Sequence, residues 1–387
     1  MRECAYPVAM RPEDFERLSV PYESGDPNGR DDAFADVIGA GVPSIRALLA
    51  DLLTDLDVGR FGIGWWTSYP ELGTKRRILI SDQLYLCVYS IERNLAEAYL
   101  HDLEAKEQHE IHGTQLARSC AVRENGLIAF RHPDRTRPSD DLPGRLGTLH
   151  IAGFFRGLVS AIDCLGGAIV GVAGLPLPIL KADMSVALRW LAREKAPSPR
   201  QRELGEALRQ IICAAGPTGW FDWAIDYRNM LVHRGRRLQG GRIDIESHLV
   251  DLQGKPVLKS VPVLQLATDP ALSDVEAFLA WKDGDPVLGE DADVTMTGLL
   301  ASTKATLAKT GTLLLDLWHE RRANPPLIVQ PSQQWPKVPS GPSSGFRGYR
   351  QTRPSAPQAM ATNPAAVKRL QAAALGSPNR ARWAAFD

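Results

Sequence analysis

One long segment of this chain shows the apolar spacing of an α-helix that needs other helices around it. Between Ile78 and His109 apolar residues recur every three or four positions over many turns; they are Leu84, Cys87, Val88, Ile91, Leu95, Ala98, Tyr99 and Leu103. Such spacing places them on one face of a helix, and a stripe of that length must be covered by partners. Glu92 and Arg93 fall on or beside this face; solvated charges are the default expectation, and a contribution to a cleft is the alternative. A helical bundle is therefore predicted.

Further segments with helical spacing supply the partners. Their predicted ranges are 32–40, 43–57, 146–172, 184–192, 202–215 and 294–322. The most apolar run, residues 164–180, is 17 residues long, and its glycines and prolines favour a buried helix ending near Gly174 over a membrane span. The paired Trp65 and Trp66 are expected to pack on the bundle, because this is more common than an exposed platform for base stacking.

The remaining segments predict a loop, a hairpin and a tail. Residues 114–144 are polar and proline-rich, which is typical of a long surface loop. Apolar residues alternate in 242–252 and again in 256–266, which predicts a β-hairpin at about 242–266. The expected fold class is mainly α, a helical bundle with this hairpin appended and a disordered C-terminal tail. Its expected parts are an irregular and helical segment 1–77, a helical domain 78–323 and a tail 324–387.

The formal net charge of zero conceals an asymmetry between the body and the tail. Residues 324–387 contain ten prolines and carry eight Lys or Arg against a single acid, Asp387. Low hydrophobicity with many prolines predicts disorder. A basic tail is typical of segments that contact RNA or another anionic partner, and other basic tails are solvated linkers. A protein partner or inhibitor that binds this tail is the alternative.

Composition also limits the class of protein. The five cysteines are widely spaced and form no CxxC pair, which indicates a reducing compartment without a disulfide framework or zinc ribbon. The N-terminus shows no apolar run of signal-peptide type, so a cytoplasmic protein without a membrane anchor is expected. His101, His109 and His112 do not have the spacing of a compact metal-ligand set. Neither GxxxxGK[ST] nor GxSxG occurs, and no cofactor is expected.

The most concentrated chemistry follows an aromatic helix predicted for residues 220–235. Its apolar face is formed by Trp220, Trp223, Tyr227, Met230 and Leu231. Arg228, Asn229 and His233 remain on the other arc, with Arg228 and His233 about 140° apart on an ideal helix. The arginines that follow are Arg234, Arg236, Arg237 and Arg242. Because guanidinium groups bind phosphate through paired hydrogen bonds and stay charged, residues 228–242 favour a phosphodiester ligand.

Arg228, Asn229 and His233 together resemble the RxxxxH signature of the HEPN superfamily (higher eukaryotes and prokaryotes nucleotide-binding). Members of this superfamily are helical bundles, and many are metal-independent ribonucleases, some of toxin or phage-defence type. The resemblance extends over residues 79–237 as a pattern of helices. Arg145 and His150 have the same spacing, but they lack the Asn and the aromatic helix.

The resemblance implies a role for each residue. His233 would act as general base or acid on the ribose 2′-hydroxyl or the leaving 5′-oxygen, since an imidazole exchanges protons near neutral pH. Arg228 would stabilise the charge of the phosphorane-like transition state, and Asn229 would orient the imidazole or the phosphate. One histidine does not easily serve as both base and acid, and the family places two motifs in one cleft of a two-fold dimer. A homodimer is therefore expected.

RNA contacts outside the motif are expected from the four arginines that follow it and from the tail. In the tail, Arg347 and Arg350 lie beside Phe346 and Tyr349, which favours phosphate pairing and base stacking. Two alternatives to cleavage remain open. The chain is then either a HEPN-like module that binds RNA or a nucleotide without cutting it, or a dimeric scaffold in which His233 is only a cation at a helix C-terminus.

Overall fold

The computed structural model of the protein is mainly α-helical, as the apolar periodicity predicts. The residues that it describes are 34–57, 60, 62–69, 72–122, 128–130, 142–193, 197–233, 241–242, 249–250, 256–257, 263–272, 275–276, 279 and 287–325. The α-helices are α3 (Pro43–Asp55), α4 (Thr74–Ser119), α5 (Leu142–Val172), α6 (Met184–Leu191), α7 (Pro199–Ala215), α8 (Trp220–His233) and α10 (Ala292–Ala323). Two short 3-10 helices, η2 (Gly64–Ser68) and η4 (Ile179–Lys181), lie between them.

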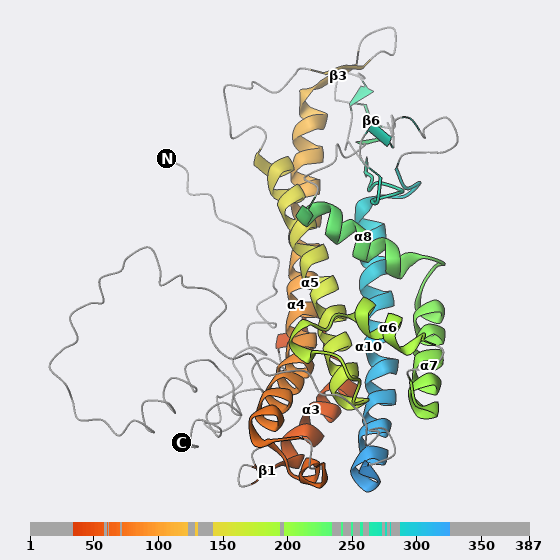
Figure 1. Cartoon of the computed structure of the whole chain (residues 1–387). Helices are drawn as coiled ribbons and strands as arrows, with labels where there is room; N and C mark the ends of the chain where they lie inside the picture. Colours follow the sequence, from red (N-terminus) through yellow and green to blue (C-terminus); the bar gives the residue numbers. More distant parts are fainter. Residues whose placement is uncertain are drawn as a thin grey trace, which may run out of the picture.

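Three long helices, α4, α5 and α10, form the centre of the bundle (Figure 1). α3 packs on α4 and α10, α6 packs on α5, and α7 packs on α6 and α10. α8 packs on α5 and runs across the long helices in the view of Figure 1. One cluster of buried side chains extends through the bundle from Ala35 to Trp318, so the segment before α4 contributes to the same core as the long helices.

Local signals account for the helix boundaries. The Asp183 carboxylate accepts the Val186 N–H at the start of α6, and Ser198 with Gln201 forms a capping box at the start of α7. Asp291 caps α10 through the N–H of Asp293. α5 ends at Val172, and Gly174 follows with φ of 59°, a left-handed conformation that glycine adopts at little cost. The predicted helix end near Gly174 is confirmed.

α4 and α5 approach each other closely because glycines line the facing side of α5. A Cβ added at Gly157 would lie 2.8 Å from the backbone of both Asn94 and Ala98. One at Gly166 would lie 2.3 Å from the Met184 nitrogen at the start of α6. Larger residues at these positions would push the helices apart, so the glycines set the packing distance of the bundle.

The C-terminus of α5 is closed by a buried arginine of α10. Arg321 is 1% exposed and donates from Nη1 to the carbonyl oxygens of Gly171 and Val172 at 2.6 and 2.7 Å. The rings of Trp65, Trp66 and Tyr69 surround its guanidinium, which lies 5.3, 5.5 and 6.0 Å from their centroids. Trp66 is 1% exposed, which confirms that the tryptophan pair packs on the bundle. The aromatic rings therefore cover a cation that caps a helix end.

The strands are short and paired in two-stranded antiparallel sheets. They are β1 (Leu56–Asp57) with β2 (Gly62–Ile63), β3 (Cys120–Val122) with β4 (Ile128–Phe130), β5 (Gly241–Arg242) with β8 (Val263–Leu264), and β6 (Leu249–Val250) with β7 (Pro256–Val257). β6 and β7 lie between β5 and β8 in the sequence. Arg242 pairs with Val263 and, nearer the turn, Val250 pairs with Pro256, as in the hairpin predicted for 242–266.

The predicted loop over residues 114–144 is wrong at both of its ends. α4 continues to Ser119 and is followed by strand β3, while α5 already begins at Leu142. Residues 114–119 carry too few apolar side chains to show a stripe, yet glutamine, leucine and arginine are good helix formers, so the helix continues. Residues 131–141 lie outside the described part of the chain.

α5 is the one helix among the described residues that is long and apolar enough to cross a membrane. In its most apolar 18-residue window 78% of the residues are buried inside the protein. Because most of this window is buried, α5 is a core helix, consistent with the buried helix predicted from residues 164–180.

Candidate functional site

α8 is fixed to the bundle by its aromatic face. Tyr227 stacks on Phe155 of α5 with ring centroids 4.3 Å apart. The Trp223 indole N–H donates to the carbonyl oxygens of Ala267 and Thr268 at 3.2 and 3.0 Å, and the Trp220 indole N–H donates to Ile212 of α7 at 3.0 Å. The predicted stripe is therefore the buried face of α8, and the polar residues of the motif are left to its other sides.

Arg228 lies on the side of α8 that adjoins α5. Its Nη2 donates to Asp163 Oδ2 at 2.9 Å, and the two side chains are 27% and 29% exposed. Arg228 Nε is buried and has no hydrogen-bond partner among the described residues. One edge of the guanidinium is thus held by a carboxylate of α5, which fixes where the charge of Arg228 lies.

Asp163 lies between Arg228 and the start of α6. Burial raises the pKa of the Asp163 carboxyl and nearby Asp183 adds to the rise, while Arg228 and the backbone N–H of Met184 lower it. The motif itself does not indicate Asp163 as its partner. A signal was present, because it is the single charged residue between Arg156 and Lys181 in an otherwise apolar stretch. A lone acid in a core helix indicates a buried partner of opposite charge.

Asn229 and His233 lie on a different side of α8 from Arg228. Asn229 is half-buried and His233 is exposed. With a spacing of three and four residues, they share one helix face with Asp222 and Asp226, which are also exposed. Within one chain the described structure thus brings Asn229 and His233 to one face and holds Arg228 near the boundary with α5. Two acids accompany the histidine on that face.

The remaining predicted RNA contacts lie outside the described residues. These are Arg234, Arg236 and Arg237 after α8 and Arg347 and Arg350 in the tail. Arg242 contributes its backbone to β5, opposite Val263, and its side chain is not described. Their contacts with RNA stay predictions.

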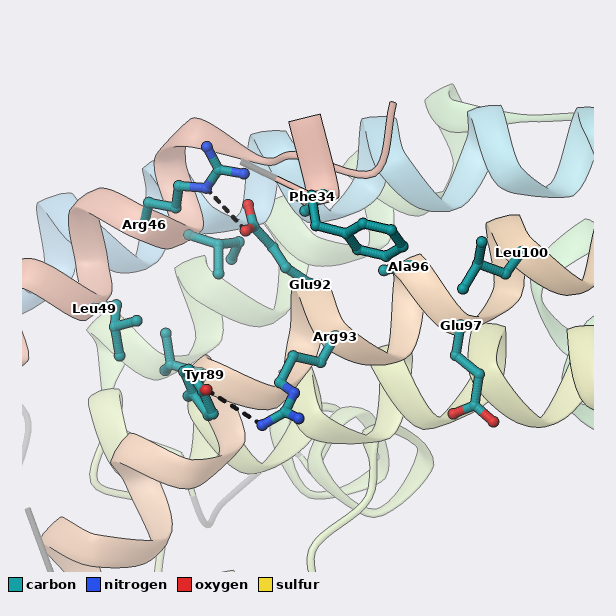
Figure 2. Close-up of a pocket in the computed structure, with 12 residues that line it drawn as sticks. Phe34, Arg46, Leu49, Tyr89, Glu92, Arg93, Ala96, Glu97 and Leu100 are labelled. Carbon is teal, nitrogen blue, oxygen red and sulfur yellow. Dashed lines mark hydrogen bonds and ion pairs between the residues drawn. The ribbon is translucent and has the colours of Figure 1, made fainter. Parts of the chain in front are cut away.

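A cavity of about 250 Å³ lies apart from the motif, between α3, α4 and residues 34–35 (Figure 2). Glu92 forms one wall and accepts from Arg46 Nε at 2.8 Å, and Arg93 donates to the Tyr89 hydroxyl at 3.2 Å. Glu92 also accepts the backbone N–H of Val42, so its carboxylate ties α3 to α4. Glu92 and Arg93 both line this cavity; the default expectation of solvated charges holds for the exposed Arg93 and is wrong for Glu92, which is buried. No residue of the Arg228 motif lines the cavity.

The histidines of α4 are placed against separate partners. His101 contacts His150 of α5, and His109 pairs with Asp293 of α10 at 2.9 Å. Within the described part of the chain, no group of three or more histidine, cysteine or acidic side chains has the arrangement of a metal site.

No protein-family model, curated protein or solved structure matches the chain. The class of protein that the described fold defines is a mainly α-helical bundle, and any activity is inferred from the residues themselves.

Proposed function

We propose that this protein is a metal-independent endoribonuclease of HEPN type that cleaves RNA through the ribose 2′-hydroxyl. The observation that carries the proposal is the placement of the Arg228, Asn229 and His233 motif at the end of α8. His233 is accessible to a large substrate, and Arg228 is anchored by Asp163 instead of extending freely into solvent. An exposed imidazole and an anchored guanidinium on the same helix suit proton transfer and charge stabilisation at a phosphodiester.

Two copies of the motif are part of this proposal. One chain supplies a single histidine of the motif, His233, about 140° around α8 from Arg228, and one imidazole does not easily act as both base and acid. A two-fold dimer that brings two α8 ends together supplies a second imidazole and a second guanidinium to one cleft. One histidine then acts as base on the 2′-hydroxyl while the other protonates the leaving 5′-oxygen.

The test is incubation of the purified full chain with mixed RNA in EDTA. Cleavage that survives chelation and leaves 2′,3′-cyclic phosphate ends is expected, because the nucleophile is the 2′-hydroxyl and not a metal-bound water. His233→Ala should abolish cleavage without lowering the melting temperature, since an exposed side chain contributes little to packing. Val232→Ala is the matched control, because Val232 is the adjacent residue and 58% exposed. Products ending in 3′-hydroxyl, or loss of cleavage in EDTA, would exclude this mechanism.

A non-catalytic dimeric scaffold is the second candidate, and the exposed Asp222 and Asp226 favour it. Carboxylates on the same helix face as His233 repel an RNA backbone. The scaffold predicts no cleavage under any condition, and a binding module predicts a salt-dependent gel shift with intact RNA. Asp222→Asn with Asp226→Asn separates the scaffold from the nuclease and the binding module, because removal of the two charges should tighten RNA binding only if RNA approaches this face.

The basic tail is proposed to increase RNA affinity without taking part in the chemistry. Deletion of residues 324–387 should lower RNA affinity and reduce the slope of affinity against salt, because Arg347 and Arg350 no longer release counterions from RNA. The cleavage chemistry of the truncated chain should be unchanged. An unchanged salt slope would assign the tail to a protein partner.

A further inference from the structure

Four histidines lie along the contact between α4 and α5; they are His101, His109, His112 and His150. Three of them face glycines of α5. A Cβ added at Gly153 would lie 2.3 Å from His101 Nε2, and Cβ atoms at Gly147 and Gly144 would lie 2.9 and 3.0 Å from the rings of His109 and His112. This end of the contact is thus built largely from imidazoles that rest on glycine backbone, with Ala105 and Ile151 as its buried apolar side chains.

His101 and His150 meet across this contact. Their Nδ1 atoms are 3.0 Å apart and their ring centroids 5.2 Å apart, so the two nitrogens face each other nearly along one line. A hydrogen bond in this geometry needs one Nδ1 to donate and the other to accept. His101 Nε2 lies 3.9 Å from Glu97 Oε1, which favours a proton on that nitrogen and leaves His101 Nδ1 as the acceptor. His150 is then the donor.

We infer that the His101 and His150 pair is a proton-operated latch between α4 and α5. With one proton between the two Nδ1 atoms the pair joins the helices, and with a proton on each Nδ1 two N–H groups face each other and the pair must separate. In the half of the contact beyond the latch, Ala105 and Ile151 belong to the buried core while Leu103, Ile111, Leu142 and Leu149 are exposed, so little apolar packing keeps it closed. On the other side of the latch, Gly157 lies directly against the backbone of Asn94 and Ala98 and holds the helices together.

The charged groups around His101 and His150 determine whether the latch is lost at low or at high pH. Burial lowers the pKa of His101, and His150 and Arg156 of α5 add to this, while Glu97 and Glu104 of α4 oppose it. The folded state therefore takes up the second proton below the ordinary value of 6.5, whereas the unfolded chain takes it up at that value. The stability that the His101 and His150 hydrogen bond contributes is therefore fully present above pH 6.5 and is lost as the pH falls below this value.

A metal ion does not explain the geometry equally well. Two imidazoles that chelate one ion direct their lone pairs at a common point at an angle to each other, with each nitrogen about 2 Å from the metal. Here the nitrogens point directly at each other across 3.0 Å, which leaves no room for an ion between them. The contact is a hydrogen bond.

The test is hydrogen exchange of the full chain, measured by mass spectrometry at about pH 8 and about pH 5.5, on either side of the ordinary histidine pKa. After correction for intrinsic exchange rates, amides of 101–115 and 142–153 should exchange several-fold faster at the lower pH, because the doubly protonated pair no longer joins the helices. Amides of 302–318 in α10 serve as the internal reference and should not change.

Three variants test the latch itself. His150→Gln keeps a donor for His101 but does not titrate, so the acid response of both segments should disappear. His101→Gln should do the same from the other side, which protects the test if one variant folds poorly. His319→Gln is the control, because His319 is a histidine of α10 that pairs with Asp51 far from the latch.

Two results would overturn the inference. One is an acid response of 101–115 and 142–153 that persists unchanged in both glutamine variants. The other is slower exchange of these segments on addition of Zn²⁺ to the native chain but not to His150→Gln, which would assign the pair to a metal site.

Discussion

Arg228 Nη2 donates to Asp163 Oδ2 at 2.9 Å and joins α8 to α5 across 65 positions of sequence. This ion pair holds the guanidinium of the motif on the α5 side of α8, while His233 lies exposed on another side. Arg228 and His233, which the sequence motif groups together, therefore have different neighbours in the structure. Asp163 determines where the positive charge of the motif is placed, and its own charge depends on that guanidinium.

Removal of Arg228 should make stability depend more strongly on pH. Burial already raises the pKa of Asp163, and Arg228 is the largest influence that lowers it. In Arg228→Ala the folded state therefore binds a proton more readily than the unfolded chain. Since the folded state then holds more protons, the free energy of unfolding falls as the pH rises above the ordinary Asp range. Chemical denaturation at several pH values measures this.

The matched control for Arg228→Ala is the double variant with Asp163→Asn. Its asparagine does not titrate, so the added pH dependence should be absent. The double variant should also be more stable than Arg228→Ala alone at neutral pH, because no half-buried carboxylate is left without its partner. Equal pH profiles for the single and double variants would show that Asp163 is not the group responsible.

Close packing of α4 on α5 predicts opposite effects of one substitution at two glycines. Gly157→Ala should lower the free energy of unfolding by about 1–3 kcal/mol, because the new Cβ meets the backbone of Asn94 and Ala98. Gly298→Ala should raise it by about 0.5–1 kcal/mol, because Gly298 lies inside α10 with nothing within 4 Å of its added Cβ. Urea denaturation of both variants checks the pair. A loss of stability in Gly298→Ala as large as that in Gly157→Ala would contradict the packing argument.

Helix content could be predicted from the sequence because it depends on local spacing. The stripe beginning at Leu84 repeats over enough turns that a helix is the only regular structure that buries it. The end of α4 could not be predicted in the same way. Beyond His112 the apolar spacing fades while the residues remain good helix formers, so α4 continues to Ser119 through residues that resemble a loop.

The partners of the candidate residues could not be predicted because they are distant in sequence. Arg228 was identified as part of a motif, but no local pattern indicates which helix carries its carboxylate. His101 and His150 were each identified from the sequence and assigned to separate, inconclusive patterns. The glycines at 144, 147 and 153 are the signal that places them together, since they mark the side of α5 that approaches α4.

The thiols of the core should resist modification. Burial raises the pKa of Cys87 to about 12 and that of Cys164 to about 11, so both remain protonated at neutral pH. Cys213 is exposed on α7 and should react first. In a Cys4→Ser, Cys120→Ser background, a chromogenic disulfide reagent should modify one thiol rapidly and the other two only at the rate of unfolding. Rapid modification of all three would show that α4 and α5 separate readily.

Arg321 is expected to contribute more to stability than its neighbour Arg322, although both are arginines in the last turn of α10. Arg321 is 1% exposed and satisfies two carbonyl groups at the end of α5, whereas the Arg322 side chain is 36% exposed and pairs with Asp51 and Asp55. Arg321→Ala leaves buried carbonyls without donors and opens a cavity beneath the aromatic rings, which should cost about 3 kcal/mol or more. Arg322→Ala removes a partly exposed ion pair and should cost about 1 kcal/mol or less.

Thermal and urea denaturation of the two arginine variants measure this difference, and Arg321→Met separates its causes. Methionine fills much of the space between Trp65, Trp66 and Tyr69 but donates no hydrogen bond. If the hydrogen bonds to Gly171 and Val172 are the main contribution, Arg321→Met should be nearly as unstable as Arg321→Ala. If side-chain volume is the main contribution, methionine should restore most of the stability that Arg321→Ala loses, as is found when a buried ionic group is replaced by a well-packed apolar one. We expect the first outcome, because these carbonyls belong to the C-terminal end of α5, where α5 itself supplies no donors.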